Sequence, residues 1–252
     1  MNRSPLRLLL LAATAITTAR AGWMEEVARN TDSTVEVGFV SRPLLRGRAP
    51  DVGTTGLLSA DANLSVPGGL GLNLYLHADV MRSLDASPRL DQRYVSLEIQ
   101  RHSESSYVGV GFGFIQQLGI NPATVASIER EAEVSFKYGH DFLAGGLSFY
   151  AGARWIPVRQ ELHADISLYY TKVLNADWSV SFSPTVGVTH AADSQGGNLG
   201  VVDGFSYIEG TVYLTVGLGG AYTLDLHGGL QVRSEGPNRT ASQGGVSISR
   251  TF

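Results

Sequence analysis

Alternation of apolar and polar residues, repeated in one segment after another, is the feature of this sequence that most limits how the chain can fold. From Gly69 to Met81, apolar residues occupy every second position, and polar residues such as Asn73 and His77 stand between them. Successive side chains of a β-strand point to opposite faces, so this segment predicts a strand with one apolar and one polar face. The same separation recurs from Glu161 to Val173 and from Trp178 to Val188.

Twelve such segments follow one another, separated by clusters of turn-forming residues. They are Val35–Arg42, Gly56–Val66, Gly69–Met81, Gln92–His102, Tyr107–Leu118, Ser127–Tyr138, Ala144–Pro157, Glu161–Val173, Trp178–Val188, Phe205–Leu218, Ala221–Gln231 and Gln243–Phe252. An even number of strands is typical of bacterial single-chain barrels. We therefore predict an all-β fold, a transmembrane antiparallel up-and-down β-barrel of about 12 strands. A count of 10 is the alternative, because the link near Val158 is unusually short.

The other links alternate between short and long, as expected for short periplasmic turns and longer external loops. Short links are predicted at Pro67-Gly68, Ser103–Ser106, Gly139–Leu143, Leu174–Asp177 and Gly219-Gly220. Longer links are predicted at Pro43–Gly53, Arg82–Leu90, Gly119–Ala126, His190–Gly204 and Ser234–Ala241.

Two other architectures share parts of this pattern. Asn121 and Pro122 are suited to the start of a helix that would run to Tyr138, although the charges in this stretch fit period two better than 3.6. A secreted β-sandwich would show the same alternation, with its apolar face buried as a core. Pro184 falls within a predicted strand and indicates a bulge or a distorted edge there.

The amino terminus predicts export. Arg3 and Arg7 precede a short apolar run, and Ala19-Arg20-Ala21 forms a small-x-small cleavage site. We expect residues 1–21 to be a cleaved signal peptide, residues 22–33 a short periplasmic segment and residues 34–252 the barrel. The chain has no Cys, so no disulfide contributes to the fold.

Composition agrees with a membrane protein that crosses the bilayer with strands. Charged residues make up only 17% of the chain, Gly occurs 30 times, and no run approaches 18 consecutive apolar residues. The net charge is −4, and removal of the three signal-peptide arginines leaves 16 − 23 = −7. An acidic protein is poorly suited to bind nucleic acid, so nucleic acid is not expected as a partner.

The carboxyl terminus supports the same location. The last predicted strand ends on Phe252, which fits a terminal β-signal recognised by the barrel-assembly machinery, although Arg250 replaces the expected aromatic or apolar residue. We expect a protein of the bacterial outer membrane, with membrane lipids, the assembly machinery and small solutes as partners.

The opening of the predicted barrel resembles a known family. Val37-Gly38-Phe39-Val40-Ser41-Arg42-Pro43-Leu44-Leu45-Arg46-Gly47 is similar to the first strand of the TorF-like family of outer-membrane porins. Ser41, Arg46 and Gly47 fit the pattern of that family, whereas Arg42 and Pro43 replace its acidic and aromatic residues. The resemblance covers about the first fifth of the chain and implies an outer-membrane barrel with a transport role.

Strand parity assigns a set of charged residues to the interior of the barrel. Glu129, Glu131 and Glu133 form a ladder of like charges, with neighbours about 6.8 Å apart at a rise of about 3.4 Å per residue. Arg154 and Lys137 are the expected partners of this ladder. It could form a selectivity constriction or a cross-strand network of salt bridges, and both interpretations stay open.

Three His/carboxylate pairs recur at a spacing of two. His77 with Asp79, and His163 with Asp165, place both side chains of each pair on one strand face, and Asp225 with His227 repeats the arrangement. A metal or acid–base pair is conceivable, but ordinary hydrogen bonding is the simpler interpretation because no sharper metal motif is present. No cofactor is indicated.

Gly109, Gly111 and Gly113 alternate with apolar residues in a predicted strand, so they indicate space on the inner wall rather than a nucleotide-binding loop. We expect a porin-like channel for passive diffusion of small solutes with a bias toward cations, because inward carboxylates outnumber cations. The alternatives are a closed barrel that presents external loops, chiefly His190–Gly204, and a lipid-modifying enzyme using His102, His140 or His190. We do not expect an enzyme, because no Gly-x-Ser-x-Gly element occurs.

Overall fold

The computed structural model describes residues 31–41, 54–66, 70–84, 89–120, 127–142, 146–191, 206–234 and 240–252. These residues form twelve strands, and a short 3-10 turn, η2 (Pro157–Arg159), links the seventh to the eighth. The strands are β1 (Thr31–Ser41), β2 (Thr54–Ser65), β3 (Leu72–Ser83), β4 (Arg89–His102), β5 (Ser106–Ile120), β6 (Ser127–Phe142), β7 (Leu147–Ile156), β8 (Glu161–Val173), β9 (Trp178–Ala191), β10 (Ser206–Gly219), β11 (Tyr222–Arg233) and β12 (Thr240–Thr251). The predicted signal peptide lies outside the described residues.

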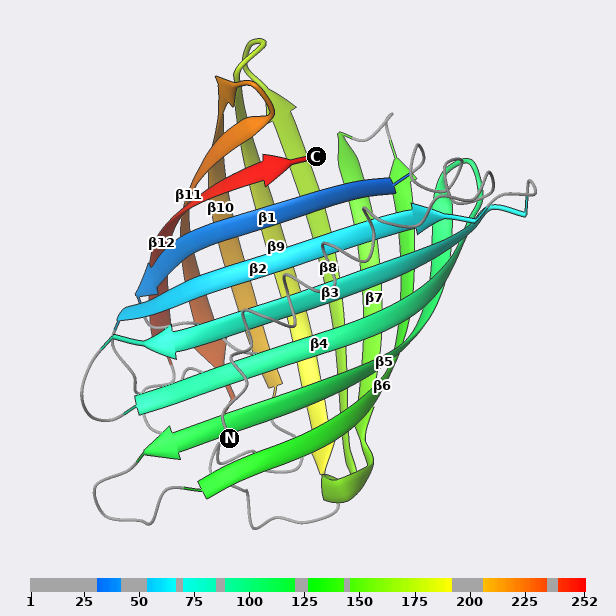
Figure 1. The fold of residues 1–252 in the computed structure, drawn as a ribbon, viewed down its shortest axis with the longest axis vertical. Helices are drawn as coiled ribbons and strands as arrows, with labels where there is room; N and C mark the ends of the chain where they lie inside the picture. Colours follow the sequence, from blue (N-terminus) through cyan, green and yellow to red (C-terminus); the bar gives the residue numbers. More distant parts are fainter. Residues whose placement is uncertain are drawn as a thin grey trace, which may run out of the picture.

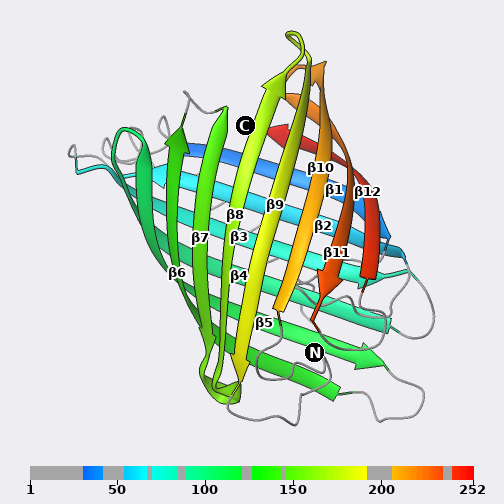
Figure 2. The ribbon, with the colours of Figure 1, turned by 180° about the vertical axis from the view of Figure 1, so that it is seen from behind.

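The strands pair antiparallel with their neighbours in sequence, and β1 pairs with β12, so the sheet closes into a barrel. Val37 lies opposite Ile248 at this closing seam. In Figure 1, β1–β6 cross the front of the barrel obliquely while β7–β11 stand more steeply behind them, and Figure 2 shows the same two walls from the other side. Strands on opposite walls cross in this way because the strands of a barrel are tilted relative to its axis.

The predicted fold class is confirmed, and each of the twelve predicted segments overlaps one strand. The helical alternative is wrong for Ser127–Tyr138, which lies in β6 and pairs with β5 at every residue. The β-sandwich and the ten-stranded count are also wrong. The short link near Val158 joins two separate strands because η2 reverses the chain within a few residues, with Gln160 in the left-handed region at φ 49°.

Pro184 does not produce the predicted bulge. The register between β8 and β9 is the same on both sides of it, but the pairs expected at Leu168 and Tyr169 are missing. Pro184 has no backbone N–H to donate, so the ladder is interrupted locally without a shift. Pairing of β9 with β10 continues through Pro184.

The outer face of the barrel is apolar along the middle of the strands. On β5, Val108, Val110, Phe112 and Phe114 are exposed, whereas the glycines between them face inward and are buried. Outward charges lie only near strand ends within the described strands. We call the end with the links 66–71, 103–105, 143–146, 174–177 and 220–221 the turn end, and the opposite end the loop end. Arg82, Asp91, Arg93 and Arg130 face outward near the loop end, and Arg101, Lys172 and Arg250 face outward near the turn end.

The interior is correspondingly polar. Among the described residues, the largest fully buried side chains are those of Gln231, Glu133, Thr55 and Thr189, and few large apolar side chains are buried. The usual relation of a soluble protein, with an apolar core and a polar surface, is therefore inverted. The described residues include no helix with the length and apolar character needed to cross a bilayer.

Candidate functional site

The inward-facing wall carries a large excess of negative charge. Among the side chains that the structure describes on the strands, twelve carboxylates and three cations occupy inward positions, a balance of 3 − 12 = −9 with His neutral. The carboxylates belong to Asp32, Glu36, Asp61, Asp79, Glu98, Glu131, Glu133, Asp141, Glu161, Asp165, Glu209 and Asp225, and the cations to Lys137, Arg154 and Arg233.

A cluster of polar side chains begins on β2 and β3. Asp61 accepts a hydrogen bond from the hydroxyl of Tyr75 and lies 2.7 Å from Nδ1 of His77. Nε2 of His77 lies 3.4 Å from Asp79, so this histidine connects two carboxylates. The ring of His77 also lies 5.7 Å from that of Tyr94 on β4, which extends the cluster along the wall.

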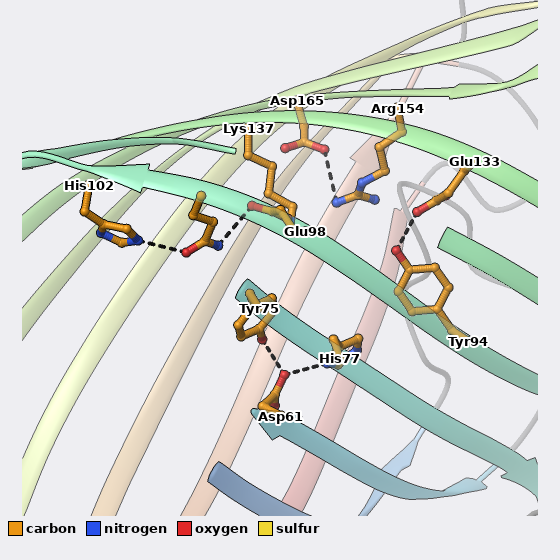
Figure 3. A network of polar contacts seen from close by, with 11 residues as sticks. Asp61, Tyr75, His77, Tyr94, Glu98, His102, Glu133, Lys137, Arg154 and Asp165 are labelled. Atoms are coloured by element: carbon orange, nitrogen blue, oxygen red, sulfur yellow. Dashed lines mark hydrogen bonds and ion pairs between the residues drawn. The ribbon is translucent and has the colours of Figure 1, made fainter. Parts of the chain in front are cut away.

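Side chains of β4 and β6 meet across β5, although these strands are not neighbours. Nζ of Lys137 on β6 lies 2.6 Å from Glu98 on β4, and the hydroxyl of Tyr94 donates a 2.6 Å hydrogen bond to Glu133 (Figure 3). Both contacts pass over the inward glycines of β5. A Cβ at Gly109 would overlap the Glu98 carboxylate.

The other two glycines are equally confined. A Cβ at Gly113 would lie 2.8 Å from Cγ of Glu133 and 2.9 Å from the ring of Tyr94, and one at Gly111 would contact Ser135. Gly109, Gly111 and Gly113 therefore form a glycine stripe on the inner face of β5, and long side chains from β4 and β6 lie over this stripe. This agrees with the prediction that the three glycines make space on the inner face.

A second cluster lies on β7–β10. Nη2 of Arg154 is 3.8 Å from Asp165, and the same carboxylate lies 3.5 Å from Nε2 of His163. Nδ1 of His163 lies 2.9 Å from the hydroxyl of Thr189, and its ring stacks on Tyr207 with centroids 5.9 Å apart. This cluster is packed more tightly, since both His163 and Thr189 are buried.

The structure places the predicted site residues in two groups. His77 and Asp79 belong to the β2–β6 cluster with Glu133 and Lys137, and His163, Asp165 and Arg154 form the β7–β10 cluster. Glu131 faces inward and is buried, whereas the side chain of Glu129 lies outside the described residues.

The predicted partners of the glutamate ladder need correction. Lys137 pairs with Glu98, and Arg154 pairs with Asp165, so both cations have carboxylate partners on other strands. The reason is geometric. Because the glycines of the stripe have no side chains, Lys137 can reach across β5 to Glu98 on β4 instead of contacting the glutamates of its own strand.

Several inward side chains remain in contact with solvent. The exposed fraction of the side chain is 35% for Lys137, 31% for Asp61 and 26% for Arg154, against 3% for Glu98. An inward side chain can be exposed only to space inside the barrel. These values therefore indicate room for water next to both clusters.

The third predicted His/carboxylate pair behaves differently. Asp225 accepts a 2.5 Å hydrogen bond from Thr215, while the ring of His227 lies 5.6 Å from that of Tyr213. His227 also covers Gly245, where a Cβ would overlap its ring. Among the described residues, no group of three or more His, Asp or Glu side chains is placed to hold a metal ion.

The contacts of His102 and His140, near strand ends, bear on the alternative that the protein is a lipid-modifying enzyme with a serine activated by histidine. His102 contacts Gln100 at 2.9 Å and stacks on Tyr107. His140 lies opposite Ser106 in the register, but the hydroxyl of Ser106 lies 2.7 Å from that of Ser103, and the ring of His140 packs on Phe142. A serine activated by histidine is thus not formed at this pair.

Sequence reasoning did not select Glu98, Asp61, Tyr94, Tyr75 or Thr189 as site residues. The one signal that could have found Glu98 and Tyr94 is the glycine stripe. Three inward glycines in alternation mean that the flanking strands must supply the side chains that fill the space above them.

No protein-family model and no curated protein matches the chain, so the TorF-like resemblance stays a prediction. Solved structures match it in fold. A KdgM porin aligns with a TM-score of 0.53 at 10% identity over 87% of this chain and 99% of its own. The COG4313 outer membrane channel from Pseudomonas putida F1 aligns with a TM-score of 0.56 at 10% identity, covering 88% and 95%. The NanC porin aligns with a TM-score of 0.50 at 12% identity, covering 86% and 98%, so this chain has the fold of outer-membrane β-barrels.

Proposed function

We propose that this protein spans the outer membrane of a Gram-negative bacterium as a channel for passive diffusion of small solutes, with a preference for cations. The membrane location is supported by the apolar outer face, whose charges are confined to the two strand ends. On β4, the outward charges at Arg93 and Arg101 enclose about 27 Å of strand at about 3.4 Å per residue. With a strand tilt of about 35–45° this corresponds to about 20 Å across the membrane, of the same order as the apolar band of about 25 Å in outer-membrane barrels.

The cation preference rests on one observation, the inward charge balance of 3 − 12 = −9 on a wall that keeps contact with solvent. Of the three inward cations, Lys137 and Arg154 are each already paired with a carboxylate. Acidic side chains that line a water-filled pore attract cations and repel anions. Asp61 and Asp79 lie on either side of His77 and remain partly exposed, so they contribute to this potential.

The predicted cleavage after residue 21 and recognition by the barrel-assembly machinery belong to the same proposal. Phe252 is exposed at the turn end, and the guanidinium of Arg250 lies 4.6 Å from its ring and 5.1 Å from that of Tyr222. Arg250 therefore supports two aromatic rings at the terminal strand, although it departs from the usual aromatic or apolar residue of a β-signal.

Single-channel recording in planar bilayers tests the proposed function. We expect stepwise currents for the refolded chain, with K⁺ more permeant than Cl⁻. The variant D61N/D79N should lower this ratio, whereas D91N, which removes an outward carboxylate near the loop end, should leave it unchanged. Absence of stepwise current would favour a closed barrel that presents its loops, and preference for Cl⁻ would contradict the proposed charge selectivity.

A further inference from the structure

One group of outward charges has no role in a channel. Arg82, Arg93 and Arg130 lie near the loop end of β3, β4 and β6, all three exposed on the outer surface. None has an ion-pair partner in the part of the chain that the structure describes. They place a net positive charge at one level of an otherwise apolar wall.

The register brings these arginines together. Arg93 lies opposite Gln116 on β5, and Gln116 lies opposite Arg130, so the three side chains form one row across adjacent strands. Two strand spacings separate Arg93 from Arg130, a distance of about 10 Å between their backbones. Arg82 joins the row diagonally, since its partner Asp91 lies two residues before Arg93 on β4.

Asp91 is the one acidic neighbour of this patch among the described outward residues, and its carboxylate also accepts a hydrogen bond from the backbone N–H of Ser83 at 3.2 Å. The balance of the patch is thus 3 − 1 = +2. The opposite end differs. There the outward cations Arg101, Lys172 and Arg250 lie on β4, β8 and β12, separated by three strands each time.

Apolar rows continue directly below the arginine row. Val95 lies opposite Phe114, and Leu97 lies opposite Phe112, and all four side chains are exposed on the outer face. A charged row above an apolar wall is complementary to an amphiphile with an anionic headgroup and acyl chains. Guanidinium groups bind phosphate well because their donors match its oxygens in pairs.

We propose that Arg82, Arg93 and Arg130, with Gln116 between them, form a binding site for the phosphate groups of a phosphorylated glycolipid in the external leaflet. The acyl chains lie along the apolar rows of β4–β6. The inference requires the barrel to lie in the outer membrane with its loop end outward, but it does not require the lumen to conduct.

Native mass spectrometry of the detergent-solubilised full chain tests this site, with lipid A carrying two phosphates as the probe. We expect R93A/R130A to lower lipid A binding by about tenfold or more, at about 1 kcal/mol for each basic residue near an anionic lipid surface. The matched control R101A/K172A removes two outward cations at the turn end and should bind like the wild type. R93K/R130K should retain part of the affinity.

The wild-type chain gives a second readout that needs no variant. Dephosphorylated lipid A and phosphatidylglycerol should both bind at least tenfold more weakly than lipid A with its phosphates. Equal binding of the dephosphorylated lipid, or an equal loss in R93A/R130A and R101A/K172A, would overturn the proposed site. Because conductance is measured separately, failure here is distinguishable from failure of the channel proposal.

Discussion

The two inner walls of the barrel handle buried polar groups in different ways. On β4–β6, a charged pair, Glu98 with Lys137, crosses a stripe of glycines and stays next to solvent at its lysine end. On β8–β10, His163 is buried between the hydroxyl of Thr189 and the ring of Tyr207, which itself covers Gly187. Inward glycines thus make space on both walls. On β4–β6 the space is filled by an ion pair, and on β8–β10 it is filled by an aromatic ring.

The difference shows what each wall contributes. The charges of the β4–β6 wall border water and can influence an ion in the lumen. On the β8–β10 wall, by contrast, His163 and Thr189 contact each other and are both buried. We therefore expect substitutions on the first wall to leave uncompensated charge and those on the second to remove hydrogen bonds or packing. The costs should differ accordingly.

Removal of the lysine charge should have the largest effect. K137M leaves the buried carboxylate of Glu98 without its cation, which should lower the free energy of unfolding by about 3 kcal/mol. Urea unfolding in lipid vesicles measures this loss. K172M removes an exposed outward lysine and should change little, and E98Q/K137M should recover most of the stability. A loss as large in E98Q/K137M as in K137M would contradict the pairing.

Filling the glycine stripe should come next. A methyl group at Gly109 overlaps the Glu98 carboxylate, so G109A should cost about 2 kcal/mol through overpacking. The matched control is G152A, on the inner face of β7, where the new Cβ would have its nearest neighbour at 3.2 Å. Equal unfolding midpoints for the two variants would show that a methyl group at Gly109 does not disturb the packing of Glu98 over the stripe.

On the β8–β10 wall, loss of the threonine hydroxyl should have a smaller effect. T189V removes the partner of Nδ1 of His163, and both groups are buried, so we expect a loss of about 1 to 1.5 kcal/mol. T185V, which removes the 2.8 Å contact with the half-buried Ser167, should cost less. The same urea titration compares them, and a larger loss in T185V would be the contrary result.

The smallest effect is expected at Tyr207. Y207F keeps the ring over Gly187 and removes a hydroxyl whose contact with Nε2 of His163 is long, at 3.5 Å, so we expect a cost below about 0.5 kcal/mol. Y207A uncovers Gly187 and should cost more than Y207F in thermal unfolding. If both variants melt together, ring packing is not what holds this wall.

Much of the fold could be predicted because a two-residue period determines both strand identity and side-chain direction. Glu131 and Glu133 were assigned to the inner face from their parity alone, and the structure buries both side chains there. Strand ends were less certain. β1 begins at Thr31 rather than at Val35, because its pairing with β2 already starts before Val35, the first apolar residue of the strand.

The contacts of the site could not be predicted in the same way. Lys137 and Glu98 lie on strands separated by β5, so their contact depends on the register of two strand pairs and on the absence of a side chain at Gly109. The effect of Pro184 also depended on pairing, because the ladder with β10 continues through it, whereas the ladder with β8 is interrupted there without a shift.

Labelling of single cysteines tests most directly whether the inner wall is wet and the outer wall lies in lipid. The chain has no native Cys, so D61C, A60C and A62C can each be made alone on β2 and treated with a charged, membrane-impermeant maleimide in intact membranes. We expect rapid labelling at position 61, which faces inward, and protection at positions 60 and 62, which face outward among apolar neighbours. Labelling of all three positions, or of positions 60 and 62 alone, would contradict a hydrated, acidic lumen enclosed by lipid-facing strands.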